Sequence, residues 1–332
     1  MIDYTGHGDA RSTEGLGYGI WTSMPEFTWW TGGTIDSLDT PDGRLAYRYW
    51  KEAQRAPKTL IGIHGFGGQN DNYIGLGEAL KPDVAVYAID LAGNGESGTR
   101  GDVESRAVHL RNLETLSALV RARHPNAKHF VAGYSLGAAY AALWAAQSRA
   151  AESRVAQGWA AQDSAAQGHQ DFSGLILFAP PYRNVLTPPP AMRRIFNLWA
   201  AIMPTFRLRM DLRSDDSIDP RYVFAAQGER FIRRRTLRLL RVSMEVVAAS
   251  KAALPDVKIP TLIVHGDADP VAHPGSARIA YYRIGASDKT LHWVRDAQHD
   301  LYDVLSGIKS SAVSDAQRAL VVGPVRAWLE TH

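Results

Sequence analysis

The stretch Phe130-Val131-Ala132-Gly133-Tyr134-Ser135-Leu136-Gly137-Ala138-Ala139 decides the fold. It reads as a short apolar strand, a Gly-x-Ser-x-Gly turn and the start of an Ala-rich helix, which is the pattern of a nucleophile elbow. On such a turn the hydroxyl of Ser135 projects clear of the backbone. Gly133 and Gly137 let the strand and the helix approach closely, where any Cβ atom would collide.

The helix after this turn points its N–H groups and the positive end of its dipole at the reacting centre. The backbone N–H of Leu136 is therefore expected to bind a developing oxyanion. A Gly-x-Ser-x-Gly pentapeptide alone is equally typical of an ordinary glycine-rich turn. The apolar strand before it and the helical run after it favour the elbow.

The composition sets broad limits on the protein. The chain has 332 residues, 45% of them hydrophobic and 21% charged, which is ordinary for a globular protein of one large α/β domain or two modest ones. The absence of cysteine excludes disulfides, Cys-ligated zinc and cysteine nucleophiles. A formal charge of +3 gives no reason to expect nucleic acid as a partner. No apolar stretch approaches the ~20 residues of a membrane span, and the polar start Met1–Asp9 is unlike a signal peptide, so we expect a cytoplasmic protein.

Apolar strands alternate with helices along the chain. A hairpin is predicted from Thr34–Leu38 and Leu45–Trp50 around a Pro-Asp-Gly turn. Helices are predicted over Asn72–Leu80, over Glu104–Arg123, and after the capping box of Ser314 and Gln317, with Pro324 expected to kink or break the last one. Further short buried strands are predicted at Leu60–Ile63, Val84–Ile89, Leu175–Phe178, Thr261–Val264 and Thr290–Val294.

This alternation predicts an α/β fold with a mostly parallel central sheet flanked by helices on both faces. The active site of such a sheet lies at the carboxyl ends of the strands. The candidate functional residues Phe66, Ser135, Asp269 and His299 all follow strands.

Three segments depart from the alternation. Residues 1–32 form an N-terminal arm, whose aromatic residues either anchor it over the domain or form a patch that touches lipid or lines the substrate entrance. Residues 147–172 read as a helix extension or a surface excursion. Residues 183–254 read as a helical cap inserted after the sixth strand, which divides the core into 33–182 and 255–332. The aromatic residues of the arm are Trp21, Phe27, Trp29 and Trp30.

The predicted cap is rich in arginine. A solvated basic face is the simplest interpretation. The alternatives are an anionic substrate or an anionic membrane surface. The arginines are Arg193, Arg194, Arg207, Arg209, Arg213, Arg221, Arg230, Arg233, Arg234, Arg235, Arg238 and Arg241.

A serine hydroxyl needs a base to take its proton and a carboxylate to hold that base in the right tautomer. In this kind of fold they follow the serine in the order acid, then His, each after a strand. Asp269 lies farther into its loop than Asp267, which we expect to bond local backbone. His299 is the histidine of the last loop. The sequence therefore predicts a triad of Ser135, Asp269 and His299.

The second N–H of an oxyanion hole is expected from Phe66, because the glycines beside it leave backbone facing the substrate. A phosphate-binding loop is disfavoured, since no Lys-Ser/Thr follows. No histidine pair has metal-ligand spacing, so neither a metal nor a cofactor site is predicted. His64 and His265 are expected to hydrogen-bond backbone.

Taken together, these motifs resemble the α/β-hydrolase superfamily, and within it the monoacylglycerol lipase and lysophospholipase group. The resemblance implies a triad of Ser135, Asp269 and His299, an oxyanion hole at Phe66 and Leu136, and a helical cap. Asn94 departs from the family, which often has His there; the arm and residues 147–172 also depart. The motifs are His64-Gly65-Phe66-Gly67, residues 90–97 with Arg100-Gly101, Gly133-Tyr134-Ser135-Leu136-Gly137, residues 265–271, and Ala297-Gln298-His299.

The functional hypothesis is a serine hydrolase that cleaves a lipid-like carboxylic ester, of the monoacylglycerol or lysophospholipid type, through an acyl-enzyme on Ser135. The expected partner is a small-molecule ester with an acyl chain, with transient membrane contact through the cap or the arm. One alternative keeps the triad for an amide, lactone, thioester or carbon–carbon bond. Another is a binding protein without turnover.

Overall fold

The computed structural model describes residues 27–156, 172–183, 190–209 and 232–332. Its centre is an eight-stranded sheet in the order β11-β10-β7-β6-β4-β5-β3-β2, parallel from β11 to β5 and antiparallel at β3 and β2. The predicted mostly parallel α/β sheet is confirmed. The strands are β2 (Thr34–Thr40), β3 (Gly43–Tyr49), β4 (Lys58–Ile63), β5 (Val84–Ile89), β6 (Lys128–Tyr134), β7 (Gly174–Phe178), β10 (Thr261–Gly266) and β11 (Lys289–Val294).

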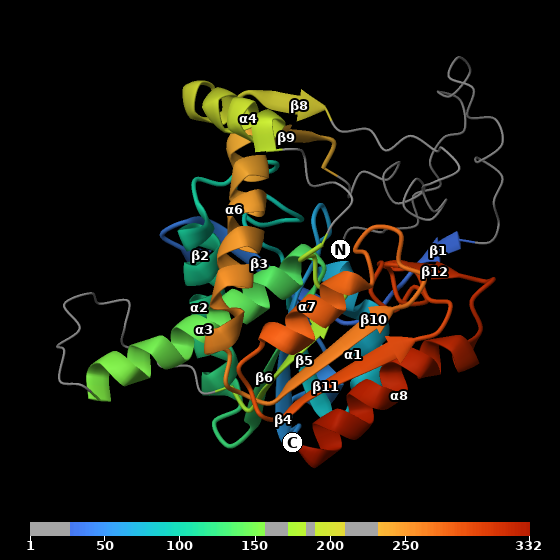
Figure 1. Cartoon of the computed structure of the whole chain (residues 1–332). Helices are drawn as coiled ribbons and strands as arrows, with labels where there is room; N and C mark the ends of the chain where they lie inside the picture. Colours follow the sequence, from blue (N-terminus) through green and yellow to red (C-terminus); the bar gives the residue numbers. More distant parts are fainter. Residues whose placement is uncertain (1–26, 157–171, 184–189, 210–231) are drawn as a thin grey trace, which may run out of the picture.

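Helices cover the sheet, with α1 and α8 packed together and α2 and α3 packed against α6 (Figure 1). Short 3-10 turns lie at Lys51–Ala53, Asn70–Tyr73 and Leu254–Asp256. None of the helices within the described ranges is long and apolar enough to cross a membrane. The main helices are α1 (Ile74–Leu80), α2 (Arg106–Arg123), α3 (Leu136–Ala156), α6 (Leu237–Ala253), α7 (Gly275–Arg283) and α8 (Asp315–Thr331).

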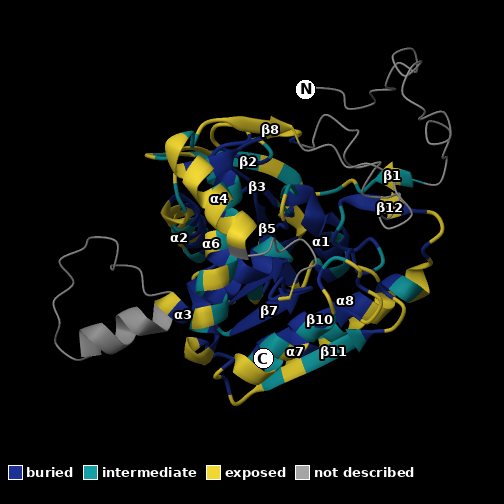
Figure 2. Cartoon of the chain, turned by 45° about the horizontal axis from the view of Figure 1, so that its top comes forward, coloured by how far each residue is buried: buried dark blue, intermediate teal, exposed yellow. Residues whose placement is uncertain are grey.

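The core sits in the sheet, because its central strands are apolar on both faces. Every residue of β5, β7 and β10 is buried, which is the pattern of a parallel strand covered by helices (Figure 2). The capping box at Ser314 and Gln317 starts α8 as predicted. Pro324 lies inside α8 without breaking it.

Between β7 and β10 the chain leaves the sheet and forms α4 (Pro190–Ile202), β8 (Arg207–Arg209), β9 (Arg234–Thr236) and α6. The sequence predicted only helices here, so the antiparallel β8–β9 pair corrects that prediction. Long-range contacts hold this pair in place: Arg207 Nη1 donates to the carbonyl of Arg100 at 2.9 Å, and Thr236 Oγ1 donates to Asp102 at 2.6 Å. The β-propensity of three residues does not reveal such long-range contacts, so the sequence did not predict this strand pair.

Near the start of the described chain, β1 (Phe27–Trp29) pairs with β12 (Ile308–Ser310). Trp30 Nε1 donates to the carbonyl of Asp303 at 3.0 Å, and Lys309 Nζ lies 4.8 Å from the centroid of the Trp30 ring. Trp30 thus anchors this segment, whereas Trp21 lies outside the described residues. Within 147–172, α3 continues to Ala156 and residues 157–171 are not described.

The turn between β6 and α3 depends on two glycines. A Cβ atom on Gly133 would lie 2.2 Å from the carbonyl oxygen of Gly137, and one on Gly137 would lie 2.0 Å from that of Ile63. Both obstacles are backbone atoms, which cannot move aside as a flexible side chain would.

Gly137→Ala is expected to destabilise the protein by about 1–3 kcal/mol, because the added methyl forces α3 away from β4. The matched control is Gly323→Ala in α8, where a Cβ would meet nothing within 4 Å. Thermal and urea unfolding of both variants are the measurements. A Gly137→Ala protein as stable as the Gly323→Ala protein would contradict this account of the elbow.

Candidate active site

Ser135 stands between the end of β6 and the start of α3. Its φ of 52° is in the left-handed region, an uncommon conformation for a residue with a side chain. Two backbone hydrogen bonds hold it there: the Ser135 N–H donates to the carbonyl of Phe178 at 2.9 Å, and the Ala138 N–H donates to the carbonyl of Ser135 at 2.9 Å. The sequence therefore predicted this strand–turn–helix correctly.

His299 links Ser135 to Asp269. His299 Nδ1 lies 2.7 Å from Asp269 Oδ2, and His299 Nε2 lies 2.9 Å from Ser135 Oγ. Since a carboxylate only accepts, the proton of the neutral ring sits on Nδ1 and Nε2 accepts from the serine hydroxyl. The structure brings together three residues that are far apart in the chain.

The position of Asp269 is set by its own loop. Its Oδ1 accepts the backbone N–H groups of Val271 and Ala272, both at 2.8 Å, which leaves Oδ2 directed at His299. The neighbouring Asp267 is exposed and accepts the N–H of Asp296 at 2.7 Å. The choice of Asp269 over Asp267 as the partner of His299 agrees with this geometry.

His265 is hydrogen-bonded to the same loop. Its Nε2–H donates to the carbonyl of Ala272 at 2.8 Å, as expected for a histidine that bonds backbone, and it lies 3.6 Å from Asp269 Oδ2. Burial lowers the pKa of His265, which keeps its ring neutral. His265 therefore stabilises the loop that carries Asp269.

The loop after β4 runs beside Ser135. A Cβ on Gly65 would lie 3.2 Å from Ser135 Cβ, so backbone passes close to the serine. His64 holds this loop: its Nδ1–H donates to the carbonyl of Gly65 at 2.7 Å and its Nε2 accepts the N–H of Leu91 at 3.0 Å. Burial lowers the pKa of His64 to about 4, so the ring stays neutral. The side chain of Phe66 is 42% exposed.

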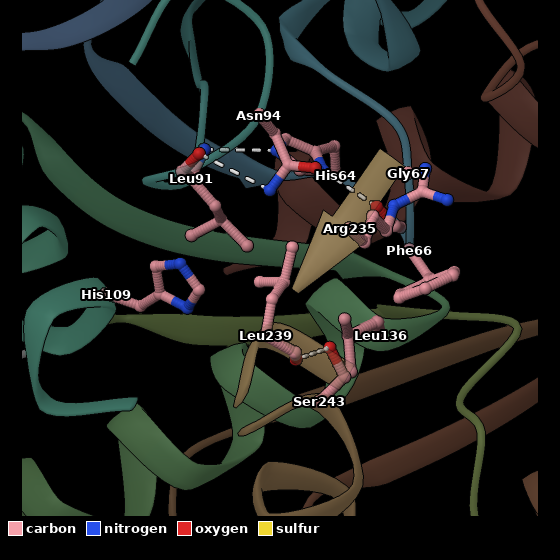
Figure 3. Close-up of a pocket in the computed structure, with 11 residues that line it drawn as sticks. His64, Phe66, Gly67, Leu91, Asn94, His109, Leu136, Arg235, Leu239 and Ser243 are labelled. Carbon is pink, nitrogen blue, oxygen red and sulfur yellow. Dashed lines mark hydrogen bonds between the residues drawn. The ribbon is translucent and has the colours of Figure 1, made fainter. Parts of the chain in front are cut away.

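Phe66 and Leu136, the two predicted oxyanion-hole residues, line one pocket (Figure 3). It is a small pocket that lies between the β4 loop, the start of α3 and the α6 region. None of the described lining residues is Asp or Glu. They are His64, Gly65, Phe66, Gly67, Leu91, Asn94, His109, Leu136, Arg235, Leu239 and Ser243.

Two polar residues of this pocket, His109 and Arg235, were not distinguished by the sequence, which assigned no role to His109 and named Arg235 only as one of the arginines of the predicted cap. His109 Nε2–H donates to the carbonyl of Ala92 at 2.9 Å, and the Tyr140 hydroxyl donates to His109 Nδ1 at 2.6 Å. Burial lowers the pKa of His109 to about 4. His109 lies in a helical stretch and Arg235 in an arginine-rich stretch, and neither residue belongs to a motif. Only contacts with residues that are distant in sequence set them apart.

In the described ranges, no group of three or more His, Cys, Asp or Glu side chains is placed to hold a metal ion.

His109→Gln is expected to flatten the pH dependence of stability. The folded protein keeps His109 neutral down to about pH 4, whereas the unfolded chain binds a proton near pH 6.5, so stability falls as the pH decreases between these values. A glutamine amide can donate to Ala92 and accept from Tyr140 without titrating. Between about pH 7 and pH 5 the variant should lose about 2 kcal/mol less than wild type in urea unfolding. Equal losses of stability in wild type and His109→Gln would contradict a lowered pKa of His109 in the folded protein.

Comparisons with known proteins agree with this architecture. The chain is 27% identical over 291 residues to mouse (Mus musculus) monoglyceride lipase, covering 85% of this chain and 88% of that protein. It is 22% identical over 308 residues to the monoacylglycerol lipase of Mycolicibacterium smegmatis, covering 87% and 94%.

Among solved structures, a soluble variant of Saccharomyces cerevisiae monoglyceride lipase with a substrate analogue has a TM-score of 0.71 at 18% identity, covering 91% of this chain and 95% of that one. A thermostable Bacillus coagulans carboxyl esterase in complex with glycerol has a TM-score of 0.64 at 16% identity, covering 91% and 99%. At identities of 18% and 16%, this structural similarity shows only that the folds are alike. The family model for serine aminopeptidase, S33, matches residues 54–303. The chain therefore belongs to the S33 family of serine hydrolases, which has the α/β-hydrolase fold.

Proposed function

We propose that this hydrolase cleaves the carboxylic ester of a lipid-like small molecule, of the monoacylglycerol or lysophospholipid type, through an acyl-enzyme on Ser135. The observation that carries the proposal is the pair of hydrogen bonds that His299 makes: its Nε2 accepts from Ser135 Oγ at 2.9 Å, and its Nδ1–H donates to Asp269 Oδ2 at 2.7 Å. The mouse and mycobacterial relatives, named as monoglyceride and monoacylglycerol lipases, support the ester class.

In the proposed mechanism His299 Nε2 takes the Ser135 proton as Oγ attacks the acyl carbon. The oxyanion is bound by the N–H groups of Phe66 and Leu136. His299 then gives its proton to the leaving alkoxide, which departs as the alcohol. A water molecule, deprotonated by the same imidazole, then attacks the acyl carbon, and the imidazolium returns that proton to Ser135 Oγ as the carboxylic acid is released. Asp269 keeps the ring oriented and stabilises the imidazolium.

We also propose that residues 183–254 form a cap over a core made of 33–182 and 255–332, with 1–32 as an arm. Arg235, Leu239 and Ser243 support this division, because they line the same pocket as Leu136. The inserted segment thus contributes one wall of the pocket, and the core contributes the other.

Amide cleavage by an aminopeptidase is the second candidate, since the family is described as a serine aminopeptidase. Such an enzyme needs a carboxylate near the scissile bond to bind the substrate amine. The described residues around the pocket include no carboxylate and do include the guanidinium of Arg235. This lining favours an ester over an aminoacyl amide. Substrate profiling compares ester hydrolysis with the cleavage of lactones, thioesters and carbon–carbon bonds.

Ser135→Ala is expected to abolish both ester hydrolysis and labelling by a fluorophosphonate probe, because no nucleophile remains. The loss in kcat should be about 10⁴-fold or more. Nitrophenyl esters of increasing chain length and aminoacyl nitroanilides are the substrates. Equal hydrolysis by both proteins would exclude Ser135 as nucleophile, and a wild type that resists the probe would favour a binding protein without turnover.

The proposed role of Asp269 is tested with two matched variants in the same loop. Asp269→Asn should reduce kcat by about 10³–10⁴-fold because the amide favours the wrong tautomer of His299. Asp267→Asn, on the exposed side of the loop, should stay within a few-fold of wild type. The reverse ranking would exchange the roles of the two residues.

A transient membrane contact through the cap is supported by α4. Its apolar side chains recur every three or four residues and face solvent, as Figure 2 shows by the exposed colour of this helix. Arg193 and Arg194 lie between them, so the helix combines apolar and cationic groups as an anionic lipid surface requires. The exposed apolar residues of α4 are Met192, Ile195, Leu198, Trp199 and Ile202. The cytoplasmic location stays a prediction from the sequence.

Ile195→Glu should lower binding to vesicles that contain phosphatidylglycerol by about tenfold, because a buried apolar contact is replaced by a charge that anionic lipid repels. The control is Leu320→Glu, a change of the same charge at another exposed leucine, on α8. Vesicle sedimentation measures the binding. Equal loss in both variants, or binding that does not depend on anionic lipid, would contradict a contact through α4.

A further inference from the structure

The backbone just after His299 has an unusual conformation. Leu301, Tyr302 and Asp303 have φ values of 53°, 55° and 60°, so three consecutive residues with side chains lie in the left-handed region. Residues other than glycine enter this region at an energetic cost, and then normally as single residues. A turn of this kind persists only where the surrounding structure holds it. Contacts from outside the turn must therefore fix it.

The carboxylate of Asp303 makes the first of these contacts. It is fully buried and accepts three hydrogen bonds: from Arg318 Nε at 2.9 Å, from Arg318 Nη2 at 2.8 Å and from the backbone N–H of Ser310 at 2.8 Å. Arg318 is a buried residue of α8, and its Nη2 also donates to the carbonyl of Ser310 at 2.7 Å. The planar guanidinium thus joins the turn to α8 and to β12 by charge-assisted hydrogen bonds.

Trp30, near the start of the described chain, makes the second contact. Its Nε1–H donates to the carbonyl of Asp303 at 3.0 Å, and its backbone N–H donates to the carbonyl of Gly307 at 3.1 Å. The indole ring lies over the guanidinium of Arg318, with 5.4 Å between the ring centroid and the guanidinium carbon. Asp303 is therefore fixed both at its carboxylate and at its backbone.

These contacts bear on His299 because it lies only four residues before Asp303. The Leu301 N–H donates to the carbonyl of Gln298 at 3.1 Å, so the turn is bonded to the backbone on the far side of His299. Relaxation of the turn toward right-handed φ values would therefore shift His299 relative to Ser135. The bond between His299 Nε2 and Ser135 Oγ is 2.9 Å long, and hydrogen-bond lengths vary by only a few tenths of an ångström.

We propose that Arg318 is a positioning residue for His299: its ion pair with Asp303 holds the left-handed turn, and the turn holds the imidazole against Ser135. Trp30 assists by binding the backbone of Asp303. The proposal rests on the ester hydrolase function proposed above. Loss of the ion pair should lower kcat and leave KM nearly unchanged, because none of the described residues that line the pocket comes from this turn.

The test measures hydrolysis of nitrophenyl hexanoate by Arg318→Met. Active sites are counted by fluorophosphonate labelling to completion, so that unfolded protein does not contribute to kcat. The variant should lose about 10- to 100-fold in kcat per active site, as expected for a misplaced base, with KM within about twofold of wild type. The rate of labelling should fall with kcat, since it depends on the same contact between His299 and Ser135.

Three further variants separate positioning from stability. Arg318→Lys keeps the charge without the planar fork and should recover part of kcat. Trp30→Phe keeps the ring, loses the indole donor and should lower kcat about two- to tenfold. The double variant Asp303→Asn/Arg318→Met should be no slower than Arg318→Met, because the two residues act as one unit.

Arg326→Met is the matched control. Arg326 also lies on α8, but it pairs with Asp83 at 3.1 Å, so its loss should leave kcat within about twofold of wild type. The positioning role is overturned if the Arg318 and Trp30 variants unfold at lower temperature yet keep wild-type kcat per active site, or if Arg326→Met loses as much. If Arg318→Met does not fold, Arg318→Lys and Trp30→Phe decide by the same criterion. A wild type that is not labelled and cleaves no ester would instead remove the hydrolase function itself.

Discussion

The close approach of three backbone segments around Ser135 is the constraint on which the rest of the site depends. The start of α3 is packed so tightly against the ends of β6 and β4 that neither Gly133 nor Gly137 has room for a methyl group. This packing forces Ser135 into its left-handed conformation and turns its hydroxyl outward, toward His299. A wider turn would separate Ser135 Oγ from His299 Nε2, because the length of a hydrogen bond varies by only a few tenths of an ångström.

His299 depends on support from the other end of the chain. Its loop contains left-handed residues at Asp296, Leu301 and Asp303, and a buried ion pair holds it to α8: Arg318 Nε and Nη2 donate to the two carboxylate oxygens of Asp303 at 2.9 and 2.8 Å. Trp30 covers this pair, with its ring 5.4 Å from the Arg318 guanidinium carbon. His299 is thus placed by contacts that reach from the start of the described chain to its last helix.

The sheet and the insertion contribute different properties to the site. The loops at the carboxyl ends of the parallel strands carry Ser135, His299 and Asp269. The segment between β7 and β10 adds Arg235 and Leu239 to the pocket, and with them a positive charge. The contacts among Ser135, His299 and Asp269 are therefore made within the core, whereas the insertion forms part of the wall of the pocket that Leu136 lines.

The sequence alone determined the alternating α/β pattern, the elbow, and the identity of Ser135, Asp269 and His299 as residues that follow strands. Such features are local, because strand periodicity and turn glycines act within a few residues. Tertiary structure decided the β8–β9 pair, the unbroken course of α8 through Pro324, and the meeting of His109 and Arg235 in one pocket. The strand pair and the pocket depend on Asp102, Tyr140 and Phe66, which are distant in sequence from the residues they contact. A local sequence pattern does not show which distant group a buried side chain will contact.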